Sequence, residues 1–428
     1  MKRRGLWLLL LALGVFLAWR FLRPMNIFVV EDRFAWPVET SAAPAVLGDL
    51  RAGTCGRCHP DFLAEWRTTI HSQAWTDPYF QADWRFDGRQ HVCRLCHTPL
   101  DRQQPHRVLG YRDEAGWNPE LVDNPAFDET LQHEGVTCAA CHYREGRIVG
   151  VLGDTEAPHP VKRLADPNQV CVRCHVVAGE RWDTFYRFPP CGTVAEIADT
   201  ACETPPPDAM RILLRILDED DLAALRREAA DARAGASGEL AVAGTAQLGC
   251  VACHMPATRR RLVPGGPLRP ARRHLWRGGH DPRMVGQALR AELRAEPVSD
   301  GERRFVFHLV NVGAAHYLPT GTPDRHLTVH LRALDRTGKV LAESKHTLKR
   351  TILWRPFIID LWDTRLRRWQ PRTYRLVVAG RAPVARVEAV VRYHLLDERR
   401  RRRIGYRNTQ PVAWEVLRRS LDVEARER

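Results

Sequence analysis

The chain has 428 residues, which exceeds the usual size of one domain and leaves length for more than one hydrophobic core. Its formal net charge of +14 would ordinarily point to nucleic acid or an anionic membrane surface as a partner. The N-terminus has the pattern of an export signal, so no nucleic-acid partner is expected.

The export signal consists of a basic start and an apolar run. Residues Met1–Arg4 (MKRR) are basic, and Gly5–Leu22 are apolar except for Arg20. No A-x-A cleavage site follows, and about 18 apolar residues lie near the lower limit for crossing a bilayer. We expect residues 1–23 to anchor the protein in the inner membrane with the remainder in the periplasm, because basic residues stay on the cytoplasmic side. A cleaved signal peptide and a soluble periplasmic protein are the alternative. Residues 24–50 are expected to be an irregular tether.

Five copies of the pattern Cys-x-x-Cys-His follow. Thiols at i and i+3 share one face of a helical turn, where they can form thioethers with the two vinyl groups of one haem. The histidine at i+4 can then bind the haem iron as the proximal ligand. Each copy is therefore predicted to hold one haem c, which gives five covalent haem groups. Motifs 1 to 5 are Cys55, Cys58 and His59; Cys93, Cys96 and His97; Cys138, Cys141 and His142; Cys171, Cys174 and His175; and Cys250, Cys253 and His254.

Zinc and disulfides are the alternatives for these cysteines. A zinc site needs four nitrogen or sulfur ligands, and it does not explain a histidine fixed after every second cysteine. Disulfide oxidoreductases usually carry one such motif rather than five. The remaining cysteines, Cys191 and Cys202, have no adjacent histidine, and in an oxidising compartment we expect them to form a disulfide.

The pattern of apolar residues changes along the chain and predicts an α+β fold. Residues 51–297 are expected to form a mostly helical and irregular domain with a haem-filled core. Helical spacing of apolar residues predicts one helix over Asp208–Arg233 and another over Met284–Arg294. Alternating apolar residues then predict several short strands, and we expect a small antiparallel β-sandwich over residues 298–407. Residues 408–428 are expected to be a basic surface extension.

The first haem segment, CGRCHPDFLAEWRTTIHSQAW, resembles the tetrahaem cytochrome c family whose best-known member accepts electrons from hydroxylamine oxidoreductase. Trp66 and His71 follow the first motif at that family's offsets, and the order of the motifs matches up to His175. The resemblance covers residues 54–175. The fifth motif, the segment GAAHYLPTG at 313–321 and DTRL at 363–366 look like larger multihaem cytochromes with an appended β-domain.

The second axial ligand of each iron cannot be identified from the motif itself. The resemblance implies His71 and His159 as distal ligands. We also predict His274, with His280 as its rival, and His316, which the β-domain would donate across the domain boundary. For His316 the alternative is a loop histidine bonded to the backbone.

The other histidines are weaker candidates. His133 is predicted to serve a neighbouring haem, and His91 is a lesser candidate. The haem of His97 has no assigned partner, because the corresponding site in the tetrahaem family is open. His308, His326 and His330 lie in predicted strands and are expected to be packed or surface residues.

Closely packed haem groups conduct electrons. The sequence therefore predicts a membrane-anchored periplasmic pentahaem cytochrome that passes electrons between other redox proteins. The alternative is an oxidoreductase that acts on a small nitrogen or sulfur compound at a five-coordinate haem, for which the haem of His97 is the candidate.

Overall fold

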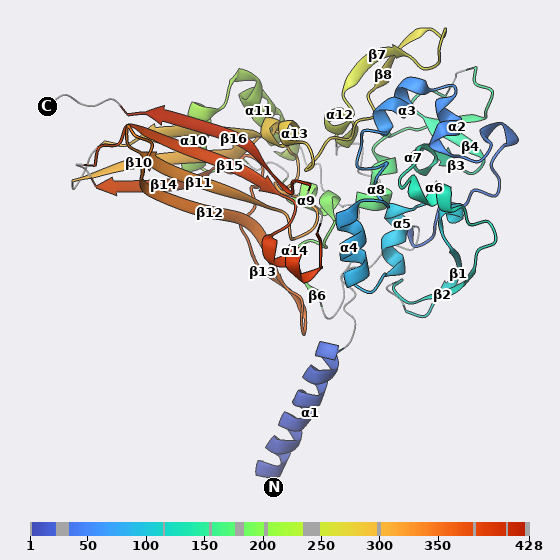
Figure 1. Cartoon of the computed structure of the whole chain (residues 1–428), viewed down its shortest axis with the longest axis horizontal. Helices are drawn as coiled ribbons and strands as arrows, with labels where there is room; N and C mark the ends of the chain where they lie inside the picture. The colour runs from blue at the N-terminus through green and yellow to red at the C-terminus, as the bar shows by residue number, and fades with distance from the viewer. Residues whose placement is uncertain are drawn as a thin grey trace.

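The computed structural model describes residues 2–22, 34–113, 116–153, 156–175, 184–200, 204–233, 249–297, 301–379, 382–407 and 410–423. Helices and several small sheets are combined, which confirms the α+β class. Figure 1 shows two bodies side by side, one of short helices and hairpins and one of long strands, with an N-terminal helix projecting from them. We call them the motif body and the β body.

The N-terminal helix α1 (Lys2–Leu22) confirms the predicted apolar helix. Its length and composition are sufficient to cross a membrane. Most of its side chains are exposed, but Arg20 near its end is buried and its Nε donates a hydrogen bond to the Pro356 carbonyl at 3.1 Å. The end of α1 therefore lies against a turn of the β body.

The motif body is built from short elements. Its helices are α2 (Ala52–Gly56), α3 (Pro60–Trp66), α4 (Pro78–Phe86), α5 (Arg94–His97), α6 (Glu129–His133), α7 (Cys138–His142), α8 (Gln169–His175), α9 (Thr193–Asp199) and α12 (Cys250–His254). Two hairpins, β1 (His106–Tyr111) with β2 (Pro119–Asp123) and β7 (Ala257–Arg261) with β8 (Leu268–Arg272), accompany a small sheet of β3 (Tyr143–Arg144), β4 (Arg147–Gly150) and β5 (Val161–Arg163). Short helices of this kind are marginal alone and depend on tertiary contacts.

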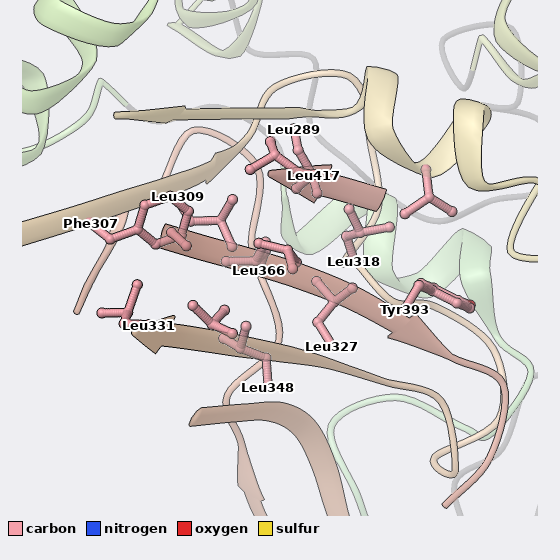
Figure 2. Close-up of a cluster of buried hydrophobic side chains, with 14 of the residues drawn as sticks. Leu289, Phe307, Leu309, Leu318, Leu327, Leu331, Leu348, Leu366, Tyr393 and Leu417 are labelled. Carbon is pink, nitrogen blue, oxygen red and sulfur yellow. The ribbon is translucent and has the colours of Figure 1, made fainter. Parts of the chain in front are cut away.

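The β body has a continuous hydrophobic core. One sheet has the order β16 (Ala413–Asp422), β15 (Arg386–His394), β11 (His326–Leu334), β12 (Val340–Leu353), β13 (Ile358–Asp363) and β6 (Thr184–Phe185); the other has β14 (Arg372–Ala379), β10 (Glu302–Asn311) and β9 (Leu289–Ala295). Side chains from both sheets form one buried cluster (Figure 2), including Phe307, Leu309, Leu327 and Tyr393. Helix α14 (Glu398–Arg403) follows β15.

The predicted helix over Asp208–Arg233 is present but divided. It forms α10 (Pro207–Ile216) and α11 (Glu219–Arg233), which are separated at Leu217 and Asp218. Leu213, Leu217 and Leu225 pack with Trp369 in a separate small core, so apolar residues of both helices are buried.

Two predictions near the edges of the β body differ from the structure. The helix predicted over Met284–Arg294 is wrong: α13 (Pro282–Gln287) is short, and β9 follows it and pairs with β10. Leu289, Ala291 and Leu293 also satisfy a period of two, so pairing along a sheet edge prevails over helical spacing. The segment expected to be a surface extension contains β16, which pairs with β15.

Candidate functional site

A single large cavity brings the motif histidines together. It has a volume of about 2650 Å³, several times the 300–1,000 Å³ typical of a pocket for one small ligand. The five motif histidines line it, and so do five others: His59, His97, His142, His175 and His254, with His71, His159, His274, His280 and His316. The lining also includes His316, Arg325 and Tyr393 of the β body, so the cavity extends from the motif body to the boundary between the bodies, and its size fits large prosthetic groups.

The orientation of the motif histidines suits metal binding. In four motifs the ring Nδ1 is hydrogen-bonded to a backbone carbonyl, which fixes the tautomer and leaves Nε2 for a metal. These contacts are His59 to Leu262 at 2.8 Å, His97 to Ala74 at 2.6 Å, His142 to Val149 at 2.8 Å and His254 to Arg277 at 2.7 Å. Among the described residues, no group of three or more His, Cys, Asp and Glu side chains is placed to hold a bare metal ion.

Two motif histidines face a second histidine across the cavity. The ring centres of His254 and His316 are 6.5 Å apart with an interplanar angle of 11°, and those of His142 and His274 are 5.9 Å apart at 25°. A metal–nitrogen distance of about 2.0 Å on each side places two ring centres roughly 6 Å apart. Each pair therefore has the spacing for one iron ion between the rings.

The distal candidates of these pairs are also oriented by the backbone. His316 Nδ1 contacts the Tyr317 carbonyl at 2.8 Å, and His274 Nδ1 contacts the Arg272 carbonyl at 3.1 Å. Both predicted distal histidines thus have their Nε2 atoms available, like those of the motifs.

His71 and His159 lie near motif histidines. Burial, and then the charge of His175, lowers the pKa of His71 to about 3. Burial and then the charge of His59 lower the pKa of His159, whose buried Nδ1 has no hydrogen-bond partner within the described part of the chain. His71 therefore lies within reach of the charges of three motif histidines, His175, His254 and His97, and His159 within reach of that of His59.

His133 is the one predicted metal ligand that the structure does not bring to the cavity. It is exposed on α6, and its Nδ1 contacts the Glu129 carbonyl of its own helix at 2.8 Å. A position five residues before motif 3 faces outward on this short helix, so the assignment of His133 is withdrawn. The expectations for the strand histidines are confirmed: His308 and His326 are buried, and His330 contacts Glu343 at 2.8 Å at the surface.

His97 has no histidine ring opposite it in the described residues. Phe80 stacks on its ring at 3.5 Å. His280 lines the cavity, and its ring centre lies 6.2 Å from that of Trp414. Burial, and then the charge of Arg325, lowers the pKa of His280. Cys191 also lines this cavity, whereas Cys202 lies outside the described residues, and with it the predicted disulfide.

Neighbouring motifs meet through their cysteines. The neighbouring thiol is the largest cause of the pKa shift in three cysteines: Cys138 lowers the pKa of Cys55, Cys174 raises that of Cys96, and Cys250 raises that of Cys171. Helix α2 contacts α7, and α5 contacts α8. Motif 4 is therefore the neighbour of motifs 2 and 5, and motif 1 is the neighbour of motif 3.

Glu65 supports the His274 segment, and sequence reasoning missed it. Its carboxylate is 7% exposed and accepts hydrogen bonds from Arg260 and Arg273 and from the backbone N–H of His274 at 2.8 Å. Burial alone would raise the pKa of Glu65, but these bonds lower it to about 2. The one sign of Glu65 in the sequence is the cluster of arginines in and after the segments that form β7 and β8, because clustered positive charges need an acidic partner.

Helix α9 and Arg365 position His316. The Tyr317 hydroxyl donates to Asp199 at 2.7 Å, and Arg365 pairs with Glu196 at 2.5 Å and Asp363 at 2.7 Å. Arg365 also donates to the Pro319 carbonyl at 3.1 Å. The DTRL segment quoted from the sequence thus holds the turn that follows His316.

Comparison with known proteins gives one informative match. The chain is similar to a penta-heme cytochrome c552 from Thermochromatium tepidum, with a TM-score of 0.57, 17% identity, and coverage of 87% of this chain and 98% of that one. No protein-family model and no curated protein matches. A beta-glucuronidase from glycoside hydrolase family 2 has a TM-score of 0.14 and 13% identity, and the match covers 24% of this chain and 9% of that one. A family 2 glycosyl hydrolase from Bacteroides cellulosilyticus has a TM-score of 0.15 and 9% identity, with coverage of 25% of this chain and 12% of that one. Both TM-scores are too low to indicate a shared fold.

The similarity to the penta-heme cytochrome concerns the fold. It extends over nearly the whole of that chain and therefore includes both bodies. The chain thus has the fold of a multihaem cytochrome.

Proposed function

We propose that the chain is a membrane-anchored periplasmic pentahaem c-type cytochrome that transfers electrons between redox proteins. The observation that carries the proposal is the cavity lined by all five motif histidines, two of which face a second histidine ring across it. Haem iron supplies reversible one-electron chemistry when it is bound. The two thiols of each motif would hold the haem, and the paired imidazoles would be its axial ligands.

From the contacts between motifs we propose a branched route for the electrons. Motif 3 lies between motifs 1 and 4, because Cys138 contacts Cys55 while the charge of Cys174 affects Cys141. Motif 4 also adjoins motif 5, where the Val251 N–H donates to the Asn168 side chain at 3.0 Å. Cys58 and Cys253 are exposed, so motifs 1 and 5 are the proposed points of contact with partners. The net charge of +14 favours acidic partners.

The β body is proposed to be a sandwich domain that contributes His316 to the haem of motif 5. Its two sheets share one buried cluster, and its paired strands extend from Leu289 to Asp422, beyond the predicted limits of 298 and 407. The bond between iron and His316 would cross the boundary between the bodies.

The membrane anchor is proposed from helix α1 and the turn beside it. Phe16 of α1 packs near Phe357 with ring centres 6.3 Å apart, next to the Arg20 contact with Pro356. Leu361 and Trp362 on the adjoining strand β13 are exposed large apolar side chains. Figure 1 shows the β12–β13 hairpin reaching towards this end of α1. Aromatic and apolar residues at the end of a spanning helix suit the membrane interface.

The haem content tests the proposed function. Mass spectrometry of the protein matured with the c-type assembly machinery should show five covalent haem additions, and four or fewer would remove at least one motif. The variant Cys58→Ala should weaken or lose the attachment of one haem, because one thioether is missing. Cys191→Ala is the matched control, since this cysteine lines the cavity but lies outside the motifs, and it should keep all five.

A histidine without a facing histidine ring among the described residues, His97, favours a second candidate function. Arg325 lines the same cavity, its charge acts on His175 and His280, and its buried Nε has no hydrogen-bond partner in the described part of the chain. A haem at motif 2 without a distal histidine would accept a small nitrogen or sulfur compound at its open position. A high-spin signal in the wild-type protein, together with binding of nitrite or hydroxylamine, would support this function; five low-spin haem groups would exclude it.

A further inference from the structure

A second, smaller pocket lies on the outer side of motif 2. Its volume is about 370 Å³, within the range of a site for one small ligand. Its lining shares no residue with the large cavity, and Cys93, Cys96 and His97 are not part of it. The residues that line it come from α4, the start of motif 2 and the β1–β2 hairpin.

The lining of this pocket is basic. Arg85, Arg89, Arg94, His91 and His106 line it together with tryptophan, glutamine, proline and leucine side chains, and no carboxylate belongs to the lining. Asp123 lies at the edge, 3.7 Å from His106, on a fully exposed side chain. The pocket therefore gathers positive charge without an acidic partner inside it.

Arg94 is held rigidly at the base of the pocket. Its guanidinium lies over the ring of Trp75 at 4.7 Å and over that of Trp84 at 4.9 Å. Both tryptophans are buried, and the Trp84 indole donates to the Gln90 carbonyl at 2.9 Å. A guanidinium fixed in this way presents its N–H groups in one direction with little entropy left to lose on binding.

Three buried polar atoms in the pocket have no partner within the described residues: Arg94 Nη1, His91 Nε2 and Gln104 Oε1. Buried groups of this kind are costly unless something binds them. Burial, and then the charges of Arg94 and His106, lowers the pKa of His91 to about 4, and burial lowers the pKa of Arg94 to about 10. Burial, and for His91 also nearby positive charge, disfavours the protonated forms of His91 and Arg94, and a bound anion would stabilise them.

We propose that this pocket binds a small oxyanion that retains one O–H group, of the hydrogen phosphate or hydrogen carbonate class. Arg94 and His91 donate to its oxygens, Arg85 and Arg89 add charge at the mouth, and the Gln104 carbonyl oxygen accepts its O–H. An anion here lies next to motif 2. It favours the oxidised state of a haem at that motif, so it lowers that haem's potential, and by reciprocity reduction weakens the binding of the anion. This coupling, unlike the binding itself, rests on the proposed haem.

Titration calorimetry of the full-length, haem-loaded protein tests the site, with phosphate, sulfate and chloride at constant ionic strength. Constant ionic strength is needed because a chain of charge +14 attracts anions generally. We expect one phosphate site, with weaker sulfate and still weaker chloride binding. Many weak sites without saturation would overturn the proposal, and equal binding of sulfate and phosphate would overturn the role of Gln104.

Three variants locate the site. Arg94→Met keeps the aliphatic stem between the tryptophans and removes the donors, so phosphate should bind about tenfold more weakly or worse. His91→Phe keeps a ring without its N–H and preserves the test if the first variant does not fold. Arg336→Gln, an exposed arginine in the β11–β12 turn, is the control and should bind as wild type. Phosphate affinity that is the same in His91→Phe and the control would overturn the proposal.

A redox titration tests the coupling between the anion and the haem separately. Five midpoint potentials that are all insensitive to phosphate would overturn the coupling, whatever the calorimetry shows.

Discussion

The two bodies differ in what fills their interiors. In the β body, Phe305, Leu327, Leu331 and their neighbours contact one another in one continuous buried cluster. The motif body has a much smaller cluster around Leu100, Leu131 and Tyr143, and beside it the cavity of about 2650 Å³. Since protein interiors are close-packed, a cavity of this size must be filled by something other than side chains. We infer that the β body can fold on its own contacts, whereas the motif body would depend on the haem groups proposed above.

The largest expected effect follows from withholding haem. Without the c-type maturation machinery, the short helices α2 to α8 and α12 should be digested rapidly and exchange their amide hydrogens freely, because they lose most of their packing. The β10, β11 and β15 core should stay protected. Limited proteolysis and hydrogen exchange, both read by mass spectrometry, measure this, with the matured protein as control. Equal protection of both bodies in the haem-free chain would contradict the comparison.

The next effect concerns the buried ion pair that joins the bodies. Burial disfavours the charge of Arg365, but Glu196 and Asp363 raise its pKa above the ordinary value. Arg365→Met leaves Glu196 buried without its partner, which should cost about 3–5 kcal/mol of unfolding free energy. Arg386→Met, which removes an exposed pair with Asp422, should leave the unfolding free energy nearly unchanged, because exposed ion pairs are screened by solvent. Denaturant titrations of the haem-loaded variants measure both, and similar losses would show that the Arg365 pair is not a joint between the bodies.

His316 tests the same joint through the iron. His316→Ala should convert one of five haem groups to high spin and allow carbon monoxide to bind after reduction, because the ring opposite His254 is removed. Electron paramagnetic resonance is the measurement, and His330→Ala at the surface of the β body is the control. A low-spin spectrum identical to that of the wild type would make His316 a structural residue of its turn.

The sequence predicted the features that depend on local spacing. A motif of five residues defines its own chemistry, so the proximal histidines could be predicted without the fold, and the structure brings all five to one cavity. Alternating apolar residues predicted the strands around Phe307 and Leu327. The pairing of His142 with His274 was not predictable, because it joins segments 132 residues apart through the Glu65 cluster. His133 was misplaced for the same reason: spacing places a residue near a motif but does not give the direction of its side chain.

The smallest expected effect is a pH dependence at the contact between the bodies. Asp324 of the β body lies 3.4 Å from the Tyr79 hydroxyl of α4 and 3.6 Å from Arg400, with Asp83 nearby. Burial is the main cause that raises its pKa from 3.8 to about 6. A raised pKa means that the stability from this group is complete below pH 3.8 and is lost as the pH rises through about 6.

Asp324→Asn should therefore remove this part of the pH dependence and be more stable at pH 7 by roughly 1–2 kcal/mol, a value reduced because the side chain is 26% exposed. The measurement is the difference in unfolding free energy between variant and wild type at several pH values, which cancels the titration of the axial histidines. Asp220→Asn, an exposed carboxylate at the start of α11, serves as the control and should give a difference that does not vary over this range. If Asp324→Asn were instead less stable at pH 7 and equal to wild type in acid, the carboxylate would be held charged by Arg400, and the contact between the bodies would be an ion pair rather than a protonated acid.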